Sequence, residues 1–231
     1  MSPQTPPVGS PTTVATQQQL ARIFPRCPAD KLALYNPAIN DMLVRAGTVT
    51  PTGAAAFLAQ VGCETGGLLW FAEIWLVGRD PATLNPGQQA IQLAQARYQT
   101  MPRLGNSEPG DDFRFRGRGA LQITGRGAYT RASAALPALG ILGPDGQPMD
   151  LVADPDLVAE VPASIFGTAL WYWCAGTDAI VAAGGLTQFA EGGYFNAVSA
   201  GVNAGDPKSR AQYGVGERLR YYDLARAVLG A

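Results

Sequence analysis

The sequence marks the starts of several helices with the same two-residue signal. A polar residue that can cap a helix comes directly before a proline at Asn36-Pro37, Thr50-Pro51, Asn85-Pro86 and Asp206-Pro207. The polar side chain accepts a hydrogen bond from a free backbone N–H, and a proline in the first turn loses no bond. A chain that repeats this signal is expected to fold mainly into helices.

Apolar residues spaced by three and four positions extend this prediction along the chain. Strand signals are weak, the best being residues 113–116, where F-R-F-R alternates before two glycines. The expected fold class is mainly α, with a small strand or hairpin element. The predicted helices cover residues 18–24, 37–46, 51–64, 86–100, 127–136, 162–174, 186–200 and 207–229.

Length and composition favour one folded domain with a short arm in front of it. The 231 residues are 47% hydrophobic and 15% charged, which is enough to bury a sizeable core. Residues 1–16 are rich in Pro, Thr, Gln and Ser, so they are expected to form a flexible arm before a single domain over 17–231. They lack the basic and apolar regions of a secretory signal peptide.

Several kinds of chemistry have little support in this composition. A net charge of −1 predicts no nucleic-acid partner. The chain has no histidine, and Cys27, Cys63 and Cys174 show no C-x-x-C spacing, so we expect no metal and no cofactor. The cysteines are interpreted as buried free thiols, with one disulfide as the second interpretation. The most apolar stretch, residues 161–175, is too short for membrane insertion.

Two glutamates near the end of the third predicted helix are candidate catalytic groups. Glu64 continues the apolar stripe of that helix, Gly66 and Gly67 end it, and Glu73 follows among tryptophans. The glycine break lets the second carboxylate turn back toward the first across a groove. Paired carboxylates in unlike surroundings suit glycosidic hydrolysis. The alternatives are an arginine partner for Glu64 and a surface position for Glu73.

A second candidate segment, residues 113–129, reads FRFRGRGALQITGRGAY. Its glycines allow a tight turn, and Gln122 and Thr124 can project polar groups toward one site. The alternatives are that these two side chains satisfy loop backbone, or that the four arginines bind nucleic acid.

Three motifs together resemble the family 19 glycoside hydrolases of the compact bacteriophage endolysin type. They are AAAFLAQVGCETGG at 54–67, NSEPGDDFRFRGRGALQITGR at 106–126 and VNAG at 202–205. The resemblance implies a lysozyme-like, two-lobed helical fold with a catalytic cleft and an inverting mechanism. It also implies hydrolysis of β-1,4 bonds between N-acetylated amino sugars.

The resemblance also implies roles for individual residues. Glu64 would be the general acid and Glu73 the general base, and Thr124 would help to hold the attacking water. Arg210, together with Gly66 and Gly67, would be structural near the site. The implied substrate-binding residues are Gln122, Asn203, Trp70, Arg126 and Tyr129.

Some residues depart from the family pattern. Cys63 and Ala128 stand where the family has histidine and asparagine, and Ala204 interrupts its asparagine-glycine-glycine motif. The expected function is an endolysin-like, muramidase-type hydrolase that acts as a monomer on peptidoglycan strands. The enzyme would remain in the host cytoplasm until release to the periplasmic or extracellular wall. The alternatives are a chitinase acting on chitin oligomers and a degenerate wall-binding or virion structural protein.

Overall fold

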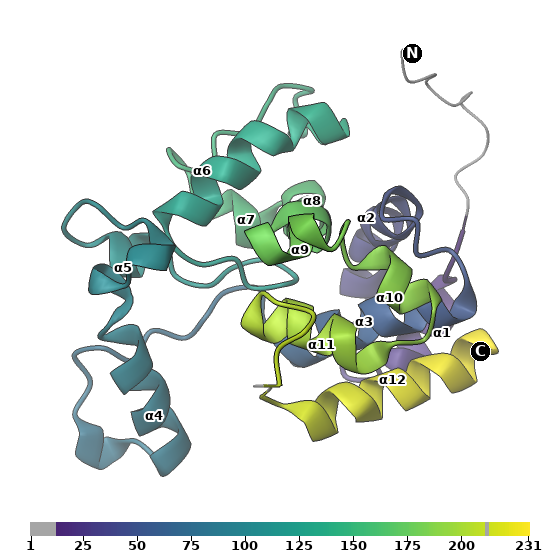
Figure 1. The fold of residues 1–231 in the computed structure, drawn as a ribbon, viewed down its shortest axis with the longest axis horizontal. Helices are drawn as coiled ribbons and strands as arrows, with labels where there is room; N and C mark the ends of the chain where they lie inside the picture. The colour runs from purple at the N-terminus through teal and green to yellow at the C-terminus, as the bar shows by residue number, and fades with distance from the viewer. Residues whose placement is uncertain (1–12, 211–212) are drawn as a thin grey trace.

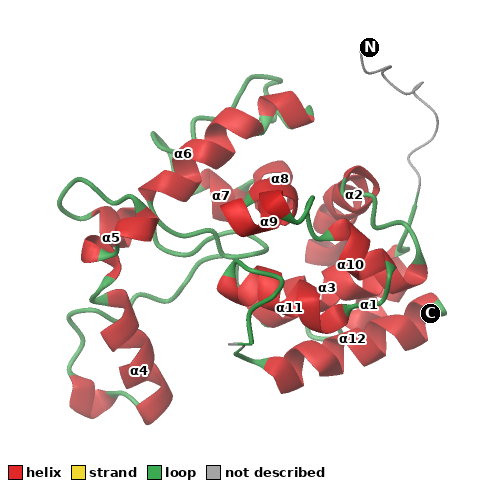
Figure 2. Ribbon diagram, viewed as in Figure 1, coloured by secondary structure: helices red, strands yellow, loops and turns green. Residues whose placement is uncertain are grey.

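The computed structural model describes residues 13–210 and 213–231, which fold into helices joined by loops (Figures 1 and 2). Short 3-10 helices lie at Pro81–Thr83 (η1), Tyr98–Thr100 (η2), Pro102–Leu104 (η3) and Pro137–Leu139 (η4). The α-helices of the described residues are α1 (Gln17–Ile23), α2 (Ala29–Arg45), α3 (Pro51–Thr65), α4 (Pro86–Gln95), α5 (Asp111–Arg114), α6 (Arg126–Ala135), α7 (Leu157–Glu160), α8 (Pro162–Ala175), α9 (Asp178–Ala182), α10 (Thr187–Glu191), α11 (Phe195–Ala204) and α12 (Val215–Leu229).

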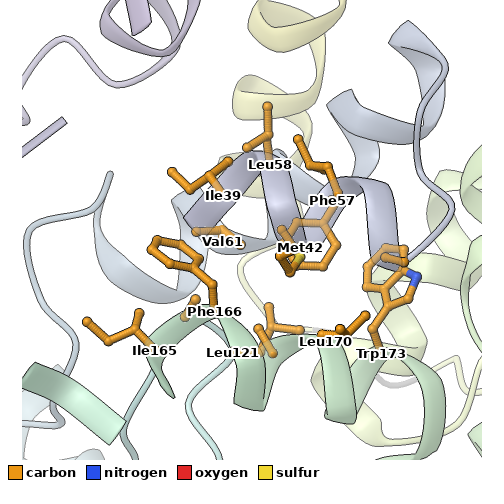
Figure 3. Close-up of a cluster of buried hydrophobic side chains, with 14 of the residues drawn as sticks. Ile39, Met42, Phe57, Leu58, Val61, Leu121, Ile165, Phe166, Leu170 and Trp173 are labelled. Atoms are coloured by element: carbon orange, nitrogen blue, oxygen red, sulfur yellow. The ribbon is translucent and has the colours of Figure 1, made fainter. Parts of the chain in front are cut away.

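Helix α3 forms the centre of the hydrophobic core. Eleven of its fifteen residues are buried, and its most extensive contacts are with α12. On another side it meets α8, where the rings of Phe57 and Trp173 lie 4.7 Å apart between centroids. Figure 3 shows this contact together with side chains from α2 and α8, including Ile39 and Phe166. Apolar packing therefore fixes the position of α3 from several directions.

The molecule has two lobes of different character. Helices α1, α3 and α12 lie together at one end, and α4 and α5 lie at the other (Figure 1). The only buried residue in α4 is Gln95, and the only one in α5 is Asp111. Both are polar, so hydrogen bonds and an ion pair contribute to holding this part of the second lobe in place, beside contacts of the Trp75 ring with Tyr98 and Phe113.

The strand prediction for residues 113–116 is wrong in position. Residues 111–114 form α5, and the Arg116 guanidinium lies 4.4 Å from the centroid of the Phe113 ring. The strand-like pairing lies nearby instead, as isolated antiparallel bridges from Arg118 to Ala72 and to Ile123. The F-R-F-R alternation therefore reflects local arginine–aromatic contacts rather than a strand.

Four predicted helix boundaries also need correction. The helix predicted over 86–100 ends at Gln95, before η2. Pro37 lies inside α2, which begins at Ala29, so Asn36 does not cap a helix start. Helix α12 begins at Val215 rather than at Pro207. The predicted helix over 186–200 is two helices, α10 and α11, because Gly192 and Gly193 separate them and Gly193 adopts a positive φ of 74°.

The predicted arm lies mostly outside the described residues, since only 13–16 belong to them. Two of these contact the domain: the backbone N–H groups of Val14 and Ala15 donate to the Asn40 side chain. Cys27, Cys63 and Cys174 are free, but only Cys27 is buried. Within the described ranges, no helix has the length and apolar character required to cross a membrane.

Candidate active site

The end of α3 places Glu64 at the edge of the core. Thr50 caps the start of the helix by accepting a hydrogen bond from the N–H of Gly53, as its sequence predicts. Gly66 ends it with a φ of 61°, and Gly67 continues the turn at 84°. Glu64 lies in the last turn with its side chain 20% exposed. The predicted role of the two glycines as the helix stop is thus visible in the backbone.

Arg218 in α12 holds the Glu64 side chain. Its Nη2 group donates to Oε1 of Glu64, and Nη1 donates to the buried Gln60 side chain. Nε donates to the carbonyl of Tyr213 at 3.2 Å, so the guanidinium is bonded on several sides. No described residue donates a hydrogen bond to Oε2 of Glu64. One carboxyl oxygen is therefore anchored, and the other is available to a substrate.

The arginine beside Glu64 is Arg218, whereas the sequence motif suggested Arg210. Arg210 is exposed in the loop that precedes α12, and Arg218 is only 3% exposed. A signal for the correct residue is present in the sequence. The buried stripe of α12 includes Tyr221, Tyr222 and Ala225, and Arg218 precedes it by the three or four positions that keep a residue on the same face.

Glu73 lies in the loop after α3 and is held by neutral donors. Its Oε2 atom accepts from the N–H of Gly117 at 3.1 Å, and its own backbone N–H donates to the Gly117 carbonyl at 2.8 Å. Its Oε1 atom accepts from Gln95 at 2.8 Å and from the Tyr98 hydroxyl at 3.2 Å. Burial, and then the charge of Glu73, raise the pKa of Tyr98, so this hydroxyl stays protonated as a donor.

Gln95, the last residue of α4, forms hydrogen bonds with Glu73 and with the loop that follows Glu73. The Gln95 side chain is fully buried, and its Nε2 group donates to Glu73 and to the Ile74 carbonyl, each at 2.8 Å. Its Oε1 atom accepts from the N–H of Leu76 at 2.8 Å. Gln92, one turn earlier, donates to the Leu76 carbonyl but makes no bond to Glu73. Sequence reasoning missed Gln95, because glutamine is common on exposed helix faces.

Gln122 and Thr124 meet Glu73 beside Gly117. A methyl group placed on Gly117 would lie 3.0 Å from Oε1 of Gln122, 3.2 Å from Oε2 of Glu73 and 3.4 Å from Oγ1 of Thr124. Three oxygen atoms therefore surround one side of this glycine. The Nε2 group of Gln122 donates to the Gly119 carbonyl. This bond orients Oε1 of Gln122 toward the oxygen atoms of Glu73 and Thr124.

Two adjoining hollows meet at these residues. The larger, of about 440 Å³, contains both Glu64 and Glu73. The smaller, of about 290 Å³, also contains Glu64 but extends toward Asn203 on α11. Gln122 and Thr124 line both hollows. The structure thus brings the two predicted carboxylates and their predicted polar neighbours to the middle of one groove.

Two further predicted residues line the groove. Trp70 is 62% exposed in the wall of the larger hollow, beside the exposed Ile74 and Ile91. Asn203 lines the smaller hollow, and its side-chain oxygen accepts from the N–H of Tyr213, whose carbonyl binds Arg218. These walls offer apolar surface in one half and amide groups in the other.

Arg126 and Tyr129 do not line either hollow. Arg126 makes two bonds of 2.6 Å to Asp111 and holds the pKa of that carboxyl at about 2, well below its usual range. Tyr129 is fully buried, and its hydroxyl donates to the Arg116 carbonyl at 2.8 Å. In this structure both residues support the segment that carries Gln122 and Thr124, rather than contacting a substrate.

The departures from the family pattern lie close to the groove. Ala128 lines the smaller hollow. Cys63 is half-buried, and burial raises the pKa of its thiol, so it does not titrate near neutral pH as a histidine would. Within residues 13–210 and 213–231, no cluster of acidic and cysteine side chains could hold a metal ion.

Comparison with known proteins places this geometry in a family. Residues 26–186 match the family described as chitinase class I. A glycosyl hydrolase family 19 domain-containing protein of Haemophilus influenzae is 33% identical over 70% of this chain and 79% of its own length. An endochitinase of Arabidopsis thaliana is 28% identical over 76% of this chain, which spans 47% of that enzyme.

Solved structures share the fold. Chitinase C from Streptomyces griseus superposes with a TM-score of 0.62 and 23% identity, with 96% of each chain covered. A class IV chitinase from Zea mays superposes with a TM-score of 0.58 and 19% identity, with 94% of each chain covered. The predicted lysozyme-like helical fold is therefore confirmed. The chain belongs to the family 19 glycoside hydrolases, the chitinase class I family.

Proposed function

We propose that this glycoside hydrolase cuts the β-1,4 bonds of peptidoglycan as a muramidase-type, endolysin-like enzyme. The observation that carries the proposal is that Glu64 and Glu73 line the same hollow, with Gln122 and Thr124 beside the second carboxylate. Two carboxylates that face the same groove are the catalytic groups that most glycoside hydrolases use. The enzyme works as a monomer and reaches the periplasmic or extracellular wall after release from the host cytoplasm.

In the proposed mechanism, Glu64 is the general acid. Its Oε1 atom stays bonded to Arg218, and Oε2 carries the proton to the glycosidic oxygen as the bond breaks. Trp70 and the neighbouring apolar side chains contact the faces of the sugar rings. Asn203 binds polar groups of the glycan in the other half of the groove.

Glu73 is the general base. A water beside Gly117 can donate one hydrogen bond to Oε2 of Glu73 and the other to Thr124 or Gln122. Its free lone pair then attacks the anomeric carbon while Glu73 takes the proton. For this inverting route, we expect the two carboxyl groups to lie about 6.5–9.5 Å apart in a substrate complex.

Chitin is the second candidate substrate, and the comparisons favour it. Matched relatives are named endochitinases, and the protein from Streptomyces griseus is a chitinase. Chitin and peptidoglycan share the N-acetylglucosamine unit, so the glutamate pair serves either polymer. The choice depends on the walls of the groove.

Analysis of digestion products tests the proposal. Purified peptidoglycan is digested and the fragments are measured by mass spectrometry before and after borohydride reduction. We expect N-acetylmuramic acid at reducible ends. Reducible glucosamine ends would show that the enzyme cuts the other β-1,4 bond of the glycan. The presence of 1,6-anhydro ends would contradict the attack by water. Faster cleavage of chitin oligomers than of peptidoglycan would select the chitinase alternative.

A further inference from the structure

The two halves of the groove differ in charge. Within the larger hollow, the charged lining residues are Glu64 and Glu73. In the smaller hollow, they are Glu64 and two arginines, Arg103 and Arg131. A neutral glycan such as chitin gives no reason for two cations in one half of the groove. The smaller hollow is therefore the place to look for what distinguishes the substrate.

Arg103 lines the smaller hollow. It belongs to η3, and its positive charge opposes the burial that raises the pKa of Tyr98 on one side and of Tyr172 on the other. Tyr98 lines the larger hollow and Tyr172 the smaller one. The Arg103 charge thus acts on groups in both halves of the groove.

Arg131 in α6 folds back toward the same region. A methyl group on Gly127 would lie 3.4 Å from Nη1 of Arg131 and 3.2 Å from the carbonyl oxygen of Leu104, the residue after Arg103. The Arg131 guanidinium also lies 5.8 Å from the ring of Trp171. The two guanidinium groups therefore approach the smaller hollow from neighbouring segments.

Neither arginine is neutralised by the protein. The ion pairs within the described residues involve Arg45, Arg118, Arg126, Arg218 and Arg220, and none includes Arg103 or Arg131. The planar guanidinium binds a carboxylate with two parallel hydrogen bonds. Two such groups without acidic partners, in a hollow that also holds Glu64, are suited to an anionic substituent of the substrate.

We infer that Arg103 and Arg131 form a subsite for a carboxylate carried on the glycan, the group that the muramyl peptides of peptidoglycan have and chitin lacks. This inference rests on the proposed function, because it assumes that the groove binds a glycan. It assigns the choice between the two polymers to the smaller hollow. The glutamate pair would then cut either backbone, and the arginines would favour the acidic one.

The test compares the double variant R103Q/R131Q with the wild type on three substrates. They are peptidoglycan freed of secondary wall polymers, the same material with its carboxyl groups amidated by carbodiimide and methylamine, and a neutral N-acetylglucosamine hexamer. The double variant R22Q/R26Q is the matched control, since it also removes two positive charges, from exposed positions that line neither hollow. Initial rates of new reducing ends give kcat/KM.

The inference predicts a selective loss. On untreated peptidoglycan, kcat/KM of the double variant falls about 10- to 100-fold, less than two buried charge-assisted bonds would give, because both arginines are exposed. On the hexamer it stays at the wild-type value. Amidation lowers wild-type kcat/KM to the level of the double variant and does not lower that of the variant further. The control behaves as the wild type on all three substrates.

The inference would be overturned by equal losses on peptidoglycan and hexamer, by no effect of amidation on the wild type, or by wild-type activity of the double variant on untreated peptidoglycan. A wild type that cuts the hexamer but not peptidoglycan also overturns it, and leaves a neutral-glycan hydrolase. A folded wild type that cuts neither polymer removes the proposed function itself. Circular dichroism of each variant establishes that it is folded.

Discussion

Glu64 and Glu73 line the same groove, but different forces hold the segments that carry them. Glu64 lies in the last turn of α3, a helix in which eleven of the fifteen residues are buried and which packs against α12 and other helices. Glu73 lies in a loop that is hydrogen-bonded to α4. Gln95 is the one buried residue of that helix. Apolar packing resists small displacements in many directions, whereas a few directional hydrogen bonds fix one geometry. The comparison implies that the Glu73 side depends more on single polar contacts.

The largest effects are expected at the two carboxylates themselves. Glu64→Gln and Glu73→Gln each keep the side-chain shape but remove the proton-transfer group, so kcat should fall about 10²- to 10⁴-fold. Glu160→Gln, at an exposed position in α7, is the control for the charge change. Release of reducing ends from N-acetylglucosamine oligomers measures the rate. A wild-type rate in either variant would remove that residue from the mechanism.

Replacement of Arg218 tests the Glu64 side of the comparison, where this ion pair is added to the apolar packing of α3. Arg218→Met leaves Glu64 and the buried Gln60 without their common donor, and removing one partner of a buried pair is costly. We expect a loss of about 3 kcal/mol in the free energy of unfolding, measured by urea denaturation. Unchanged stability would mean that α3 and α12 do not need this contact.

Low pH should destabilise the second lobe, because it protonates Asp111. Arg126 lowers the pKa of Asp111 to about 2 in the folded protein, and the usual value is about 3.9. The pKa is depressed by folding, so the ion pair contributes its full stability above about pH 4 and loses it as the pH falls toward 2. The free energy of unfolding of the wild type should exceed that of Asp111→Asn by about 2 kcal/mol at pH 7. This difference should disappear as the pH falls from about 4 to 2. A gap independent of pH in urea titrations would contradict this assignment.

A smaller but more specific effect is expected at Gln95. Gln95→Met removes the bonds to Glu73 and to the loop, so kcat should fall about tenfold while KM stays near the wild-type value, because the base is misplaced. Gln92→Met is the matched control: it loses contacts to the same loop but none to Glu73. Equal kcat values for the two variants would show that Gln95 acts only on loop stability.

The isosteric variant Gln95→Glu gives an independent readout. It places a second carboxyl group next to Glu73, and like charges disfavour ionisation of both. The acidic limb of the pH–rate profile should therefore move to higher pH than in the wild type. A profile that does not move, with a lower rate at every pH, would point to a structural role for Gln95.

The sequence predicted the apolar part of this arrangement better than the polar part. The cap at Thr50, the stripe of α3 and the stop at Gly66 specify where Glu64 lies, because each depends on local backbone chemistry. Gln122 and Thr124 were found through the motif around them. Gln95 and Arg218 were missed because their partners lie 22 and 154 positions away. Hydrogen bonds at such separations leave no periodic pattern in the chain.

Tyr129 illustrates the opposite error. Its motif suggested a substrate contact, yet the ring packs edge-on to Phe115 at 5.2 Å between centroids and is fully buried. An aromatic side chain next to polar motif residues is equally suited to a sugar face and to a core. Only the path of the whole segment decides which of the two it contacts.

The anomeric form of the first product tests the central claim, that Glu73 activates a water opposite the bond that Glu64 protonates. Proton NMR follows the early hydrolysis of a β-1,4-linked N-acetylglucosamine hexamer before the new reducing ends equilibrate. The two-carboxylate, water-based account predicts that these ends appear first in the α form, because one displacement inverts the β linkage. Initial β ends would contradict it, since they require two displacements.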